Sequence, residues 1–170
     1  AEALDKPMFR NMRRKKQLLP ADVTERILQT GLVGVLGVSG DDDYPYVVPV
    51  NYSYEAGKIY FHSANTGHKL DGIQRNSKVS FCVIDRDDIV PEEFTSYFRS
   101  AIAFGRASIV TDEAVKQHAL ELLARKYSPG LEAEGAVVIR DEWNNVSIVE
   151  IDIEHVTGKE AIELVNKKAS

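Results

Sequence analysis

Gly57-Lys-Ile-Tyr-Phe-His-Ser-Ala-Asn-Thr-Gly-His68-Lys69-Leu-Asp-Gly-Ile-Gln-Arg-Asn76 is the stretch that decides the fold, because it passes from a strand through a polar turn into a short helix. Residues 59–61 are β-branched or aromatic, as in a strand. The Asn-Thr-Gly sequence at 65–67 is typical of a turn with a capping residue. Leu70 and Ile73 then predict the buried side of a helix.

The start of this predicted helix has the features of an anion site. The first backbone N–H groups of a helix lack partners within the helix, and with the helix dipole they favour a negative group. Lys69 adds a positive charge in the first turn. His62, Ser63 and Thr66 supply neutral hydrogen-bond partners around it. The turn therefore predicts a phosphate site, and the simpler alternative is a lysine that sits in water.

Length and composition indicate one domain over residues 1–170, with residues 1–18 as a basic N-terminal arm. The hydrophobic fraction of 44% and the charged fraction of 28% are those of a globular protein. No apolar run approaches the roughly 20 residues of a membrane-spanning helix, and no export signal precedes the domain, so we expect a cytoplasmic protein without a membrane partner. The single cysteine, Cys82, excludes an internal disulfide, and we expect no metal site.

The basic arm contrasts with a net charge of −5 for the whole chain. Its cations are Arg10, Arg13, Arg14, Lys15 and Lys16. Such an arm can bind nucleic acid, but the rest of the chain is acidic and matches no common nucleic-acid module. We therefore expect no nucleic-acid partner, and an arm that is solvated or clasps a protein partner.

A series of strands follows a helix predicted for residues 20–30. The expected strands number about six and lie at 32–38, 44–54, 59–61, 78–85, 95–110 and 146–156. Pro45 and Pro49 cannot donate ladder hydrogen bonds, so the second strand needs an interruption or an open edge. Residues 85–91 read as a charged loop, and Gly105 as a bulge or bend point. A second long helix is capped at 111–113 and ends near Tyr127, and 131–144 is ambiguous.

This pattern predicts a mainly β fold, because consecutive strands joined by short turns pair in antiparallel fashion. A closed or nearly closed barrel with flanking helices fits the order of elements. The sequence contains no Gly-rich dinucleotide fingerprint, no Walker-type loop, no His-Glu-x-x-His and no nucleophile elbow, which excludes several common enzyme classes. Of the four histidines, His62 and His68 flank the candidate phosphate turn, whereas His118 and His155 read as fillers.

Five segments, in this order, resemble the FMN-binding split-barrel family. They are 45–52 (PYVVPVNY), 59–64 (IYFHSA), 67–69 (GHK), 76–81 (NSKVSF) and 97–100 (YFRS). That family includes pyridoxamine phosphate oxidase, and the chain looks closest to its nitroimidazole-resistance (Nim-type) branch. The resemblance implies a six-stranded antiparallel split barrel of Greek-key type, spanning most of the chain.

The resemblance also implies a homodimer with two FMN sites in the subunit interface. The resemblance places Pro49, Val50 and Asn51 along the flavin ring, and His62 and Ser63 near the ring and the ribityl chain. It places His68 and Lys69 at the phosphate, and Arg99 and Ser100 on a strand that reaches the flavin. Trp143 either packs on a flavin or fills an interface or the core. FMN is the expected cofactor, ahead of FAD, a deazaflavin or haem.

The chain departs from the oxidases of that family at two places. The oxidases have an arginine beside the phosphate-binding lysine where this chain has His68, and the basic residues of their second strand are replaced by residues 46–51. Fewer fixed cations weaken the grip on a phosphorylated substrate, which disfavours vitamin B6 oxidase activity. His68 in turn suits a catalytic role as proton donor during reduction of a substrate.

The resulting expectation is an FMN-dependent oxidoreductase that passes electrons from a reduced nicotinamide donor to a small acceptor, such as a nitro-aromatic compound or a quinone. A pyridoxamine phosphate oxidase-like enzyme is the alternative within the same chemistry. A non-catalytic flavin- or haem-binding protein is the alternative from another class.

Overall fold

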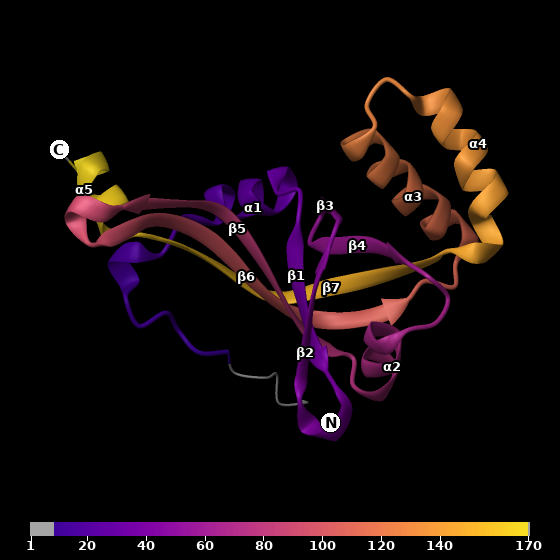
Figure 1. The fold of residues 1–170 in the computed structure, drawn as a ribbon, viewed down its shortest axis with the longest axis horizontal. Coiled ribbons are helices and arrows are strands. Elements are labelled where there is room, and N and C mark those ends of the chain that lie inside the picture. The colour runs from indigo at the N-terminus through magenta and orange to yellow at the C-terminus, as the bar shows by residue number, and fades with distance from the viewer. Residues whose placement is uncertain (1–8, 170) are drawn as a thin grey trace, which may run out of the picture.

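The computed structural model describes residues 9–169, and its centre is a seven-stranded antiparallel sheet (Figure 1). The strand order is β2-β1-β5-β6-β7-β4-β3. The bounds are β1 Gly34–Ser39, β2 Pro45–Val50, β3 Ser53–Glu55, β4 Lys58–Ser63, β5 Lys78–Val90, β6 Thr95–Ile109 and β7 Ser147–Glu160. The mainly β, antiparallel split-barrel fold predicted from the sequence is confirmed.

Five α-helices and four 3₁₀ turns flank the sheet over the described residues. The helices are α1 Ala21–Thr30, α2 His68–Arg75, α3 Glu113–Tyr127, α4 Glu132–Glu142 and α5 Ile162–Ala169, and the turns are Lys15–Gln17, Asp41–Asp43, Pro91–Glu93 and Trp143–Asn145. Figure 1 shows α3 and α4 side by side at one end of the sheet and α5 at the opposite end. No helix in this part of the chain is long and apolar enough to cross a membrane.

The main core lies between the inner face of the sheet and α1. On β1 the side chains alternate between buried and half-buried, because successive strand residues face opposite sides of the sheet. Leu36, Phe61 and Phe81 are fully or almost fully buried on the inner face, and Leu28 of α1 joins them. This burial fixes which face of each strand is left for a ligand or a partner.

The predicted strand 44–54 is two strands, so the sheet has seven strands where about six were expected. The break falls at Asn51 and Tyr52, whose side chains bond outside the ladder. The Asn51 amide donates to the Leu32 carbonyl oxygen at 2.9 Å, and the buried Tyr52 hydroxyl donates to the Leu28 carbonyl oxygen at 2.6 Å. The sheet therefore does not close, and β2 and β3 are its two edges. The open edge predicted from Pro45 and Pro49 is β2.

The charged segment 85–91 was wrongly predicted to be a loop, since β5 continues to Val90 and pairs with the start of β6. The two strands form an arm that projects from the sheet (Figure 1). Helix α5, which the sequence analysis did not predict, packs against this arm through Leu164, which clusters with Tyr97 and Ala161. That long-range apolar contact outweighs the polar composition of the segment.

The predicted irregularity at Gly105 is confirmed by a register shift between Phe104 and Gly105 where β6 pairs with β7. A Cβ atom at Gly105 would lie 2.4 Å from the Asp152 carbonyl oxygen, so only glycine allows this approach of the two strands. The ambiguous segment after Leu131 is α4 followed by the turn at Trp143. The basic arm lies partly outside the described residues, and its end pairs with β7 through a bridge between Leu18 and Lys159.

Candidate functional site

The start of α2 carries unpaired backbone donors. The residue before the helix is Gly67, with φ of 154°, and no side chain caps the helix, so the capping residue expected in the turn 65–67 is not there. A Cβ atom at Gly67 would meet nothing within 4 Å, but its φ requires glycine. No side chain therefore caps the first N–H groups of α2, as the anion-site prediction requires.

Lys69 lies in this first turn with its side chain half-buried. Within residues 9–169 it has no hydrogen bond or ion pair to another side chain or carbonyl group. The other end of α2 is anchored instead, because Arg75 donates to the Ser39 carbonyl oxygen at 3.1 Å and pairs with Asp41 at 3.4 Å. Helix α2 is thus fixed at its C-terminal end and presents an available cation at its N-terminal end.

His68 packs against strand β2. Its ring stacks on Tyr46 with centroids 3.9 Å apart and an angle of 18° between the planes. Its Nε2 atom lies 3.9 Å from Asp41 Oδ2, a contact between two exposed side chains. The position of His68 is therefore set mainly by the aromatic contact.

His62 and Ser63 lie at the end of β4 and point to opposite faces, with His62 exposed and Ser63 buried. The Ser63 hydroxyl donates to the Ala64 carbonyl oxygen at 2.8 Å. Asn65 links this end of β4 to the turn that holds Trp143, since its amide donates to the Asn144 carbonyl oxygen at 2.8 Å. A ligand on one face of the sheet can therefore contact the side chain of His62 or that of Ser63, but not both.

Trp143 is half-buried and packs on α3 in this chain. The Lys116 ammonium group lies 4.4 Å from the centroid of its ring and donates to its carbonyl oxygen at 2.8 Å. The hydrogen bond between Asn65 and Asn144 thus links the turn that holds Trp143 to the segment before α2.

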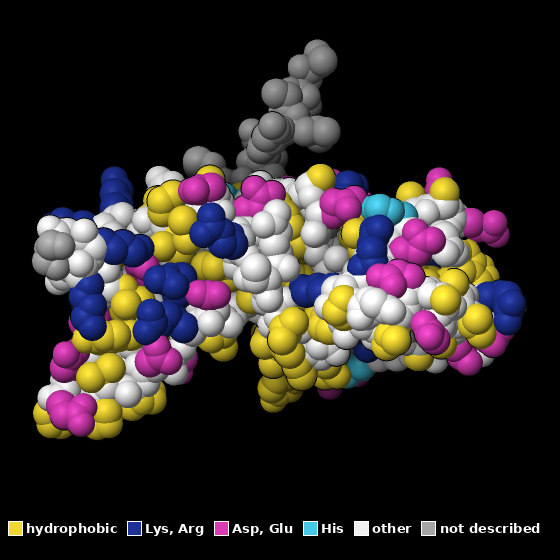
Figure 2. All heavy atoms as spheres, turned by 90° about the horizontal axis from the view of Figure 1, so that it is seen from above, with side chains coloured by type: hydrophobic (Ala, Val, Ile, Leu, Met, Phe, Trp, Pro, Cys, Tyr) yellow, Lys and Arg dark blue, Asp and Glu magenta, His cyan; other side chains and the backbone are white. Residues whose placement is uncertain are grey.

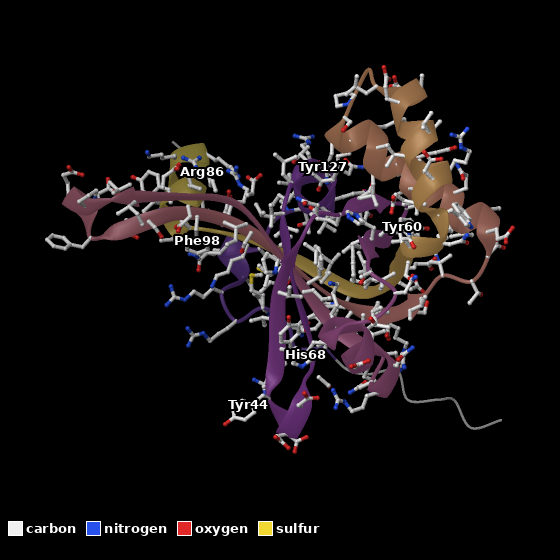
Figure 3. The ribbon with its side chains drawn as sticks, turned by 45° about the vertical axis from the view of Figure 1, so that its right-hand side comes forward. Tyr44, Tyr60, His68, Arg86, Phe98 and Tyr127 are labelled. Carbon is white, nitrogen blue, oxygen red and sulfur yellow. The ribbon has the colours of Figure 1, made fainter. Side chains whose placement is uncertain are left out.

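Pro49, Val50 and Asn51 lie at the other end of β2 from His68. Figure 3 shows His68 and Tyr127 near opposite ends of the β1–β2 pair. At about 3.3 Å per residue, Asn51 is about 16 Å along the chain from Tyr46, which His68 contacts. The predicted phosphate and ring contacts are thus separated along one open strand edge.

Arg99 and Ser100 lie on β6 in the projecting arm, away from α2. Arg99 pairs with Glu160 at 3.2 Å and with Asp85 at 3.3 Å. Figure 2 shows Lys and Arg side chains interleaved with Asp and Glu over the end of the molecule that holds the arm and α5. A single chain does not bring Arg99 or Ser100 to the α2 turn.

Two residues beside the predicted ring position were not foreseen. Lys126 and Tyr127 end α3 and bond to the backbone of Tyr52, the residue after Asn51. Burial lowers the pKa of Lys126 to about 8, and burial also raises the pKa of Tyr52. In the sequence, Lys126 and Tyr127 are an ordinary end of an amphipathic helix, and their contact with residue 52 is visible only in the fold.

A comparison with family models matches residues 20–160 to the family described as pyridoxamine 5′-phosphate oxidase. The match covers most of the chain and includes every predicted site residue. No curated protein matches the chain by sequence.

Solved structures with the same fold include several flavin proteins. A protein from Bacteroides thetaiotaomicron, described as a 5-nitroimidazole antibiotic resistance protein, has a TM-score of 0.69 and 25% identity over 84% of this chain and 86% of its own. An FAD-binding protein from Mesorhizobium loti has a TM-score of 0.63 and 25% identity over 85% of this chain and 97% of its own. A flavocytochrome from Azotobacter vinelandii has a TM-score of 0.77 over 89% of this chain and 72% of its own, but at 20% identity it shows the fold alone.

Proposed function

We propose that this chain, which belongs to the pyridoxamine 5′-phosphate oxidase family, is an FMN-dependent oxidoreductase that passes electrons from a reduced nicotinamide donor to a small acceptor. A nitro-aromatic compound or a quinone is the acceptor class we favour. The likeness to a protein described by nitroimidazole resistance supports the first of these.

The observation that carries this proposal is the unpaired Lys69 ammonium group beside the uncapped start of α2. A half-buried cation next to unpaired N–H groups fits a terminal phosphate, which accepts several charge-assisted hydrogen bonds. Among the described residues no carboxylate neutralises Lys69. The residues present therefore fit the phosphate of FMN.

The open edge of β2 fits the rest of the cofactor. Its free backbone groups run from the α2 turn to Pro49, Val50 and Asn51, so an elongated molecule held at Lys69 reaches those residues along one edge. A bound flavin supplies the hydride and electron chemistry. The protein residues would orient it: Lys69 would hold the phosphate, the β2 edge would align the ring, and His68, stacked on Tyr46, would lie at the phosphate end.

A second copy of this chain is the partner we propose, because a group of apolar side chains on the outer face of the sheet is exposed or half-buried. Pro49, Val35, Cys82 and Ile102 lie opposite one another across four adjacent strands. Val47 on the same face is 64% exposed. In such a dimer, Arg99 and Ser100 of one chain meet the flavin of the other only if the arm of β5 and β6 crosses the interface. Trp143 lies outside that arm, in the turn after α4.

Two alternatives differ in the residues they need. A pyridoxamine phosphate oxidase requires cations along the second strand, where β2 offers Tyr46, Val48 and Val50 facing inward and prolines facing outward. A flavin- or haem-binding protein without turnover has support from solved neighbours that bind FAD or haem. FAD differs from FMN in carrying a second nucleotide, so the same α2 turn holds a diphosphate in that case.

The direct test identifies the ligand of the purified protein by absorbance and mass, and then titrates the stripped protein with FMN, FAD and riboflavin. FMN is expected to bind about 10–100 times more tightly than riboflavin, because riboflavin lacks the phosphate. Equal affinity for FMN and riboflavin would remove the phosphate site. A colourless protein that takes up none of the three would overturn the proposal.

The dimer is tested with Ile102→Asp, which places a charge in the apolar outer face. We expect sedimentation to show dissociation to monomers together with release of FMN. Leu131→Asp is the matched control, since Leu131 is an exposed leucine in the α3–α4 loop. A monomeric wild-type protein that retains FMN would contradict the dimer and leave the phosphate site in place.

A further inference from the structure

A polar cluster at the far end of β2 has no part in the function proposed so far. It is built by Lys126 and Tyr127 at the end of α3, by Tyr52 between β2 and β3, and by the Leu32 carbonyl group before β1. Three segments that are far apart in sequence meet there, next to Asn51. We therefore asked what these groups hold.

Tyr127 binds both backbone groups of residue 52. Its hydroxyl accepts from the Tyr52 N–H group at 2.9 Å, and its single proton lies between the Leu32 carbonyl oxygen at 2.7 Å and the Tyr52 carbonyl oxygen at 3.0 Å. Asn51 donates to the same Leu32 oxygen at 2.9 Å. The peptide on each side of Tyr52 is thus fixed by side chains, because the ladder between β1 and β2 ends at Val50.

Lys126 completes the cluster. Its ammonium group donates to the Tyr52 carbonyl oxygen at 2.9 Å and lies 4.0 Å from the centroid of the Tyr52 ring. Within residues 9–169 no carboxylate forms an ion pair with it. Burial lowers the pKa of Lys126 to about 8, so holding its charge here costs folding stability. An apolar side chain of similar length would avoid that cost, which points to a use for the amine.

We propose that Lys126 and Tyr127 form a clamp that positions the Pro49–Asn51 segment of β2 for the flavin ring, and that the clamp is tighter when Lys126 is charged. This inference rests on the proposed function. The ammonium form gives a charge-assisted hydrogen bond to the Tyr52 carbonyl oxygen and a cation–π contact with its ring, and the neutral amine gives neither at full strength. Lys126 is thus a positioning residue, acting on the cofactor through residues 49–52.

No other described group takes over this titration. The groups that face Lys126 directly are the phenols of Tyr52 and Tyr127. Three carboxylates on the elements packed against α3 bond to other groups: Glu55 with His118 at 2.8 Å, Glu150 with Lys58, and Glu132 with the Gly130 N–H group at 3.2 Å. A step in flavin affinity near pH 8 that is lost in variants of Lys126 therefore reports on Lys126.

The experiment measures FMN affinity from pH 6.5 to 9.5 by fluorescence titration for the wild type, Lys126→Arg and Lys126→Met. The wild-type affinity is expected to fall about tenfold as the pH rises through about 8. Lys126→Arg keeps its charge and should stay at the tight limit throughout, whereas Lys126→Met should stay at the weak limit throughout. If Lys126 only filled space, FMN affinity would not depend on its charge in this way.

The matched control is Arg125→Met, which removes an exposed cation from the preceding position and should leave the wild-type curve unchanged. If Lys126→Met does not fold, the comparison of wild type with Lys126→Arg at pH 9.5 decides the question. FMN binding with one common pH dependence in all variants would overturn the clamp alone. Failure of the wild type to bind FMN at any pH would overturn the proposed function, and the clamp with it.

Discussion

The turn before α2 and the arm of β5 and β6 each carry a cation predicted to contact the cofactor, and the two cations have opposite surroundings. Lys69 has no partner among the described residues. Arg99 is held by Asp85 and Glu160, at 3.3 and 3.2 Å. The resemblance to the family selects both positions, and the chemistry of the turn supports Lys69 in addition. What differs is whether the charge is already neutralised, and only an unneutralised charge is available to a ligand.

Because Glu160 is buried, the difference in pairing between Arg99 and Lys69 becomes a difference in folding free energy. The Glu160 side chain is only 5% exposed, and it also pairs with Lys168 at 2.6 Å. A buried carboxylate that loses its partner is strongly destabilising, whereas removal of Lys69 leaves no carboxylate without its partner. Variants at Arg99 should therefore act on folding, and variants at Lys69 on binding.

The largest effect is expected for Arg99→Ala. Leaving Glu160 with Lys168 alone should lower the free energy of unfolding by about 3 kcal/mol, at the low end for a broken buried pair. Urea unfolding followed by far-UV circular dichroism measures this change. FMN affinity per folded molecule should stay near the wild-type value.

Arg106→Ala is the control for Arg99→Ala. Arg106 lies on β6, as Arg99 does, and pairs with Glu154 of β7 at 3.1 Å. Its side chain is 53% exposed, so the free energy of unfolding should fall by only about 0.5 kcal/mol. A large loss of FMN affinity in Arg99→Ala, with stability unchanged, would instead make Arg99 a cofactor ligand contributed across the dimer interface.

Lys69→Ala should give the converse result. We expect FMN binding to weaken by about 1.5–3 kcal/mol, because one charge-assisted contact to the phosphate is lost, while riboflavin binding stays the same. The free energy of unfolding should change by less than about 0.5 kcal/mol.

Lys16→Ala is the matched control for Lys69→Ala, since it removes an exposed lysine from the basic arm. It should change neither FMN affinity nor stability. Equal weakening of FMN and riboflavin by Lys69→Ala would mean that Lys69 does not hold the phosphate.

Lys126 lies between these two cases, because it is desolvated but has no acidic partner. Its pKa of about 8 lies below the ordinary value of 10.5, so between those values the unfolded chain binds more protons than the folded chain. The free energy of unfolding should therefore rise with pH across that window, by about 1–2 kcal/mol after allowing for partial exposure. Urea unfolding from pH 7.5 to 10.5 measures the rise, and Lys126→Met should abolish it.

The same contrast explains what the sequence could predict. The α2 turn is local: Gly67, Lys69, Leu70 and Ile73 lie within one short stretch, so periodicity and turn chemistry placed them correctly. Glu160 is 61 residues from Arg99 and Tyr52 is 75 residues from Tyr127, and no local pattern encodes those contacts. The segment 85–90 is polar by composition, and only its pairing with β6 and the packing of α5 on the arm make it a strand.

The smallest predicted effect concerns the contact between His68, at the start of α2, and Asp41. Asp41→Asn removes the only carboxylate within 4 Å of His68 among the described residues, at 3.9 Å from Nε2, and also the partner of Arg75 at 3.4 Å. Because the Asp41 side chain is 74% exposed, solvent screens both pairs, and the free energy of unfolding should change by no more than about 0.5 kcal/mol. Stacking on Tyr46 keeps His68 in place without the charge. A loss above about 1 kcal/mol would show that the ion pairs of Asp41 hold this turn, as those of Glu160 hold the arm.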